Sequence, residues 1–183
     1  METLNFDASS SLKLNFWVRI GDISYFEGPI LSLFYDFIKQ KFYIFDWVDR
    51  NECVNRWLIY GVSPHIILNF MMGKMSLLNM FKMRSEMDVY YIDLHFSHKN
   101  FYEVPAYLLK SIPDTYYPNE NNYFDKEDCP EFDKIFEILT SSLNRNDMKN
   151  EYKMDSKINF QLMKPKRLSQ IINIPKLTKK NPI

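Results

Sequence analysis

The sequence is poor in the residues that build disulfide frameworks, metal-binding loops and flexible turns. Its 183 residues include two cysteines, Cys53 and Cys129, and four glycines. Two cysteines so far apart fit neither a zinc-binding spacing nor a disulfide framework. The sequence also lacks a basic and apolar secretion signal and an apolar run of membrane-spanning length. We therefore expect a cytoplasmic protein with reduced thiols and no membrane contact.

Large apolar side chains, in contrast, are abundant. Hydrophobic residues make up 46% of the chain and aromatic residues 16%, with 15 Phe and 12 Tyr. This composition favours a packed core that is rich in β-strands. The frequent Phe, Tyr, Ile, Asn and Lys are encoded by AT-rich codons, and this bias suggests a bacterial or phage source without indicating a function.

The charges are distributed unevenly, although the formal net charge is +0. From Arg145 onward the chain holds ten Lys or Arg and three acids, a surplus of +7, so the preceding residues carry −7. Such asymmetry indicates an interaction segment, and the alternative is that this basic tail, residues 145–183, folds back on the acidic body. Its candidate contacts with a partner or with nucleic-acid phosphates are Lys164, Lys166, Arg167, Lys176, Lys179 and Lys180.

Strand-like segments follow one another through the first hundred residues. They are residues 12–20, 23–27, 30–35, 41–48, 56–62 and 89–94, with 101–104 as a further pairing segment. This pattern predicts an antiparallel meander of about five or six strands, with a turn at Gly21-Asp22. Residues 1–11 are polar and are predicted to be a flexible arm, which leaves residues 12–144 as the folded domain.

Short helices are predicted to cover one face of this sheet, which makes the fold class α+β. Ser63-Pro64 and Ser76 are typical helix starts, and Gly73 is a typical helix end. A third helix opens at Cys129-Pro130, and its apolar residues recur at helical spacing. These residues are Phe132, Ile135, Phe136, Leu139 and Leu143.

Trp57 is a core residue for which the sequence suggests a specific place. It follows Arg56 in the segment 56–62, which returns from the polar turn at residues 49–52. We expect its ring to be buried against the covering helices, near Phe70 or Phe81.

Asp93, His95 and His98 form a candidate metal site. Asp93 and His95 share one face of a predicted strand, and His98 can return from the turn that follows. Three nitrogen and oxygen ligands suit a catalytic metal with an open coordination position. The alternative, which we favour, is a strand end with two ordinary polar histidines, because no spacing typical of metal ligands accompanies them.

Other polar patterns have structural explanations. The acidic residues that precede and open the third helix suit the positive end of its dipole, or receive the basic tail; they are Glu120, Asp125, Glu127, Asp128, Glu131 and Asp133. The two short helices have the outline of a helix-turn-helix, but the second lacks the polar and basic outward face of a recognition helix. No GxSxG, Walker A, GxGxxG or HExxH motif occurs.

A family resemblance rests on three segments. They are YFEGPILSLF at residues 25–34, NRWL at residues 55–58 and IPDTYYP at residues 112–118. The chain resembles a family of small uncharacterised bacterial proteins in these segments, over residues 20–124. The resemblance implies no activity and no cofactor.

From these patterns we expect a non-catalytic cytoplasmic binding module, an adaptor or a regulatory subunit, without a cofactor. Its partner would be a protein, either a second copy or the product of a neighbouring gene, in a bacterial defence or toxin–antitoxin-like system. One alternative is a nucleic-acid-binding accessory protein that uses the basic tail. Another is a metal-dependent hydrolase that uses Asp93, His95 and His98.

Overall fold

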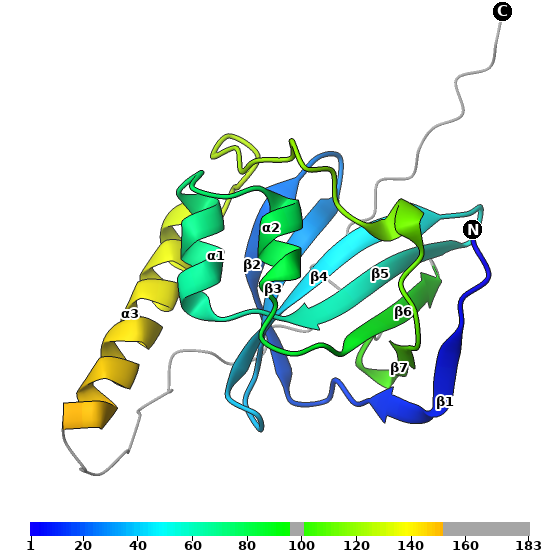
Figure 1. Cartoon of the computed structure of the whole chain (residues 1–183), viewed down its shortest axis with the longest axis horizontal. Helices are drawn as coiled ribbons and strands as arrows, with labels where there is room; N and C mark the ends of the chain where they lie inside the picture. The colour runs from blue at the N-terminus through cyan, green and yellow to red at the C-terminus, as the bar shows by residue number, and fades with distance from the viewer. Residues whose placement is uncertain (96–100, 152–183) are drawn as a thin grey trace, which may run out of the picture.

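The computed structural model describes residues 1–95 and 101–151, and within them it shows one antiparallel sheet of seven strands with three α-helices (Figure 1). The strands are β1 (Phe6–Leu12), β2 (Trp17–Tyr25), β3 (Pro29–Asp36), β4 (Lys41–Arg50), β5 (Val54–Gly61), β6 (Val89–His95) and β7 (Ala106–Leu109). Their order is β1-β7-β6-β5-β4-β3-β2, so β2 to β7 form a meander and β1 returns to pair with β7. The α+β class and the antiparallel meander are confirmed, whereas the sheet has seven strands rather than five or six.

Strand β1 replaces most of the predicted flexible arm. Its polar middle suits an exposed sheet edge, and its two ends are apolar. The ring centre of Phe6 lies 5.3 Å from those of Tyr91 and Tyr107, and Leu12 is buried opposite Ala106. The contacts at both ends hold the segment in the sheet, while a bulge lies between them.

Strand β2 runs through the predicted turn at Gly21-Asp22. The pairing with β3 shifts register on both sides of this dipeptide, so the extra residues form bulges instead of a reversal. Gly21 has a packing role here, because a Cβ atom at this position would lie 2.8 Å from Glu131 Oε2. The glycine therefore allows the third helix to approach the strand closely.

Helices α1 (Pro64–Met71) and α2 (Leu77–Lys82) lie side by side over one face of the sheet, and α3 (Phe132–Glu151) lies next to α1 (Figure 1). The predicted starts are confirmed: Ser63 caps α1 ahead of Pro64, and the Ser76 hydroxyl accepts a hydrogen bond from the Asn79 N–H at 3.4 Å. Gly73 follows α1 with a φ of 68°, a left-handed conformation that ends a helix.

Two short 3₁₀ helices complete the described elements, η1 (Phe101–Glu103) and η2 (Asp114–Tyr116). The pairing predicted for residues 101–104 comes instead from β7, immediately downstream. None of the described helices has both the length and the apolar character that crossing a bilayer requires.

The connection between β1 and β2 forces the sheet to curl. These strands are the two edges of the sheet, yet the five Cα steps from Leu12 to Trp17 reach at most about 18 Å. Six interstrand spacings in a flat sheet would separate the edges by about 29 Å. The sheet therefore bends around its second face, where Leu14 from the connection and Trp17 at the start of β2 are buried.

The curled sheet has a buried cluster on each face. The first lies between the sheet and the helices and includes Leu58, Phe70 and Phe81. The second lies on the opposite face and includes Trp17 and Trp57. The burial predicted for Trp57 is confirmed by its exposed fraction of 8%, but its predicted place near Phe70 or Phe81 is wrong. Alternation along β5 directs Leu58 toward the helices and Trp57 away from them.

We expect Trp57→Ala to lower the free energy of unfolding by about 3–5 kcal/mol, because it empties a large part of the second cluster. Urea unfolding of the full chain measures this loss. Met72→Ala, at an exposed position beyond α1, is the control and should change stability by less than about 0.5 kcal/mol. An equally small loss for Trp57→Ala would contradict the burial of its ring.

Candidate binding site

The turn between β3 and β4 projects from one end of the sheet (Figure 1). Asp36, the last residue of β3, is buried, and its carboxylate accepts hydrogen bonds from the N–H groups of Ile38 at 2.8 Å and Lys39 at 3.1 Å. Gln40 closes the turn with a φ of 55°. The fold therefore satisfies the polar groups of the turn internally and holds Phe37 and Ile38 at its end.

The connection between β1 and β2 passes beside this turn. The N–H of Phe37 donates a hydrogen bond to the carbonyl of Phe16 at 3.3 Å, which joins the two loops. The exposed fractions are 62% for Phe16, 37% for Phe37 and 69% for Ile38. We call these three residues the apolar tip. Neighbouring exposed apolar side chains of this kind mark interaction sites more often than isolated ones do.

Basic side chains flank the apolar tip. Lys13 and Lys39 are exposed on its two loops, and the Lys39 ammonium lies 5.8 Å from the ring centre of Tyr43. Lys41 forms an ion pair with Glu86, which connects the turn to the segment before β6. The tip thus combines an exposed apolar surface with positive charge at its rim.

A polar network at the other end of the sheet surrounds the buried Arg56. Its Nε and Nη2 donate hydrogen bonds to the two carboxylate oxygens of Asp93, each at 2.7 Å. Its Nη1 donates to the carbonyl of Glu2 at 2.7 Å and to the Tyr116 hydroxyl at 3.1 Å. Burial lowers the pKa of Arg56, but the bonds with Asp93 and Tyr116 outweigh it, and the net shift is upward. This network links the N-terminal segment, β5, β6 and η2.

The structure describes two of the three predicted metal ligands, Asp93 and His95. The Asp93 carboxylate is in a bidentate ion pair with Arg56, and His95 is exposed at the end of β6. His98 falls in residues 96–100, outside the described residues, so the three-residue site stays a prediction. Within residues 1–95 and 101–151, no group of three His, Cys, Asp or Glu side chains is arranged to hold a metal ion.

A second polar network covers the edge of β2. The Asp22 carboxylate accepts a hydrogen bond from Ser32 Oγ at 2.6 Å and pairs with Arg19. Burial raises the pKa of Asp22 more than these two partners lower it. The Asp22 N–H donates to Glu131 Oε2 at 3.0 Å, and the Tyr25 N–H donates to the carbonyl of Asp128 at 2.8 Å. The start of α3 and the loop before it thus occupy edge positions to which another strand would bind.

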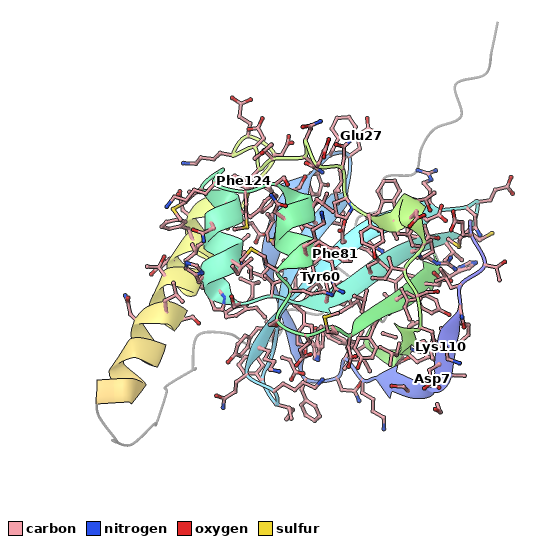
Figure 2. The ribbon with its side chains drawn as sticks, in the orientation of Figure 1. Asp7, Glu27, Tyr60, Phe81, Lys110 and Phe124 are labelled. Atoms are coloured by element: carbon pink, nitrogen blue, oxygen red, sulfur yellow. The ribbon has the colours of Figure 1, made fainter. Side chains whose placement is uncertain are left out.

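Asp46 is a buried acid in the helix-facing core. The Tyr60 hydroxyl donates a hydrogen bond to its Oδ2 at 3.2 Å, and the Tyr60 ring packs edge-on against Phe81 (Figure 2). Burial raises the pKa of Asp46 to about 7, because the charged form loses its hydration, and the bond from Tyr60 opposes only part of this shift. Below that pH the folded protein keeps the side chain protonated.

This raised pKa predicts a specific pH dependence of stability. The unfolded chain ionises Asp46 near pH 4, so its stabilising protonation is fully present below that pH and is lost as pH rises to about 7. The loss is on the order of 4 kcal/mol, because the shift is about three pKa units and each unit is worth about 1.4 kcal/mol. Asp46→Asn lacks this titration, so the stability of the wild type relative to the variant should fall between pH 4 and pH 7.

Urea unfolding of both proteins at several pH values measures this difference. The comparison removes the contributions of the other acids, and any constant penalty of the asparagine amide shifts both ends of the curve equally. A difference that stays level between pH 4 and pH 7 would show that Asp46 titrates normally in the folded protein.

The predicted partner-binding residues of the tail cannot be compared with this geometry. Lys164, Lys166, Arg167, Lys176, Lys179 and Lys180 lie outside the described residues. The apolar tip was not predicted, although the sequence carries a signal for it: Phe37 and Ile38 lie in a turn between two alternating strands, where polar residues are typical. The approach of Phe16 depends on long-range pairing and has no local signal.

The chain was compared with known protein families, curated proteins and solved structures. The model described as "Family of unknown function (DUF6575)" matches residues 23–173. No curated protein and no solved structure matches the chain. The match is consistent with the predicted resemblance to an uncharacterised family, and it extends beyond residue 124 into the basic tail.

Proposed function

The chain belongs to the DUF6575 family, whose function is unknown, and we propose that it is a non-catalytic protein-binding module, an adaptor or a regulatory subunit. The observation that carries this proposal is the apolar tip. Phe16, Phe37 and Ile38 are exposed on two loops that hydrogen bonds hold together. The prominent buried charged groups elsewhere, Arg56 and Asp22, are engaged in networks that stabilise the fold.

The energetics of the tip support binding. Burying one Phe or Ile side chain completely is worth roughly 1.5–3 kcal/mol. Because Asp36 already holds the turn, docking requires little further ordering of the backbone, and ordering is a main cost of association. A few well-packed apolar side chains at the centre of an interface carry most of its affinity. The rim lysines would favour a partner with an acidic border.

We expect Ile38→Asp to weaken partner binding without unfolding the protein, because it places a charge at the centre of the contact while the side chain is largely exposed in the free chain. A photo-crosslinker at residue 38 would identify the partner in host cells. Calorimetry with the purified partner would then give the affinities. The dissociation constant should rise by at least about tenfold, which corresponds to 1.4 kcal/mol.

Met72→Asp is the matched control, since Met72 is also an exposed apolar residue but follows α1 at the other end of the helix layer. Its affinity should stay within about twofold of the wild type. Equal affinities for Ile38→Asp and the wild type would remove the apolar tip from the interface.

The second candidate function is nucleic-acid binding through the basic tail. The family match supports it only in extent, because the matched range of residues 23–173 includes the positions of Lys164, Lys166 and Arg167. The tail has a net charge of +7 and the preceding residues have a net charge of −7. The positive charge of the tail would attract the phosphates of a nucleic acid.

Such binding should weaken steeply with salt. Replacing the three residues Lys164, Lys166 and Arg167 by Ala in the full chain should reduce the slope of log affinity against log salt by about 2–3, if each contacts one phosphate. Fluorescence anisotropy with single- and double-stranded DNA and RNA measures this slope. An unchanged slope in the triple variant would exclude these residues as phosphate contacts.

A further inference from the structure

The hairpin between β2 and β3 carries a second exposed patch, at the opposite end of the sheet from the apolar tip. The exposed fractions are 40% for Tyr25 and 71% for Phe26. Glu27 follows at the end of the hairpin, as Figure 2 shows, with a φ of 51°. Glu127 and Asp128 are exposed on the neighbouring loop. We call these five residues the acidic tip.

The acidic tip is also held by internal hydrogen bonds. The Tyr25 N–H donates to the carbonyl of Asp128 at 2.8 Å, which fixes the hairpin against the loop. The Phe26 N–H donates to the carbonyl of Gly28 at 2.9 Å and closes the turn. As in the apolar tip, the backbone is ordered before any partner arrives, and the aromatic side chains remain exposed.

The two tips face away from each other because one strand separates them. β3 begins at Pro29 beside the acidic tip and ends at Asp36 beside the apolar tip, a length of about 25 Å for eight residues. A single molecule therefore cannot bring its own tips together. Two molecules can, and their charges are complementary: Lys13 and Lys39 flank one tip, whereas the other contains three acids.

We propose that the apolar tip of one copy binds the acidic tip of a second copy, head to tail. The contact would place Ile38 and Phe16 against the exposed Phe26, with Lys39 facing the carboxylates of the acidic tip. The inference rests on the proposed function, since it names a second copy as a partner of the apolar tip. Because α3 and its preceding loop occupy the adjacent edge of β2, side chains carry the contact and strand addition does not.

A head-to-tail contact has a characteristic consequence. The two surfaces are different, so an open assembly of any length keeps one free apolar tip at one end and one free acidic tip at the other. Assemblies of the full chain should therefore grow with concentration beyond a dimer, as rings or open chains. Since charges flank the contact, growth should weaken as salt increases.

Two variants of the full chain test the proposal. Ile38→Asp disables the apolar tip and keeps the acidic tip. The double variant Glu127→Lys/Asp128→Lys disables the acidic tip and keeps the apolar tip. Both change exposed side chains, and circular dichroism would verify that they fold. Met72→Asp again serves as the control and should assemble like the wild type.

Sedimentation velocity over a concentration series gives the readout. The wild type should form species larger than a dimer, and each variant alone should stay monomeric. An equimolar mixture of the two variants should form dimers and nothing larger, because one functional tip of each kind remains. A mixture that stays monomeric while the wild type assembles would overturn the head-to-tail contact in favour of a different self-association.

A wild type that remains monomeric at every concentration would also overturn this inference. The proposed function is then judged separately by the binding experiment with Ile38→Asp. If Ile38→Asp no longer binds a purified partner that is a different protein, the result would support a binding module whose apolar tip does not recognise a second copy of the chain. Retention of that partner would contradict both proposals.

Discussion

The short connection between β1 and β2 is the constraint on which much of the structure depends. Four residues join the two edges of a seven-stranded sheet, and they can do so because the sheet curls. The curl encloses the second cluster around Trp17 and Trp57, so the face away from the helices is buried as well. The same connection brings Phe16 beside Phe37. One chain-length constraint thus creates both an inner core and the apolar tip.

Buried charges in this protein stabilise junctions between distant segments. Arg56 joins the N-terminal segment, β6 and η2 to the centre of the sheet, and Asp22 lies where α3 meets β2. Removing one partner from such a network leaves an uncompensated buried charge, which is strongly destabilising. Asp46 differs because Tyr60 is its hydrogen-bonding partner and burial raises its pKa to about 7, which favours the uncharged form below that pH. The contacts of these buried ionisable groups therefore account for how distant segments of the chain are held together.

Local signals predicted the parts of the fold that depend on a few neighbouring residues. The Ser76 hydroxyl caps α2, Pro64 follows the extended Ser63 at the start of α1, and Gly73 ends α1 in a left-handed conformation, so these helix boundaries could be predicted closely. β1 was missed because its place in the sheet depends on β7, about a hundred residues away. Trp57 was assigned to the wrong face because alternation identifies two faces without indicating which one the helices cover.

The candidate site illustrates the same limit more sharply. The residues that the sequence offered as site candidates were charged or metal-binding. One of them, Asp93, forms an ion pair with Arg56 in the structure. The exposed Phe37 and Ile38 belong to no catalytic motif. They form a patch only in the folded protein, where Phe16 lies beside Phe37 and Asp36 holds the turn through hydrogen bonds. An exposed apolar side chain in a turn lowers the stability of the free protein only slightly. The same side chain contributes substantially to the free energy of binding once a partner covers it. Its exposure on a preorganised loop is therefore the observation on which the proposed binding role rests.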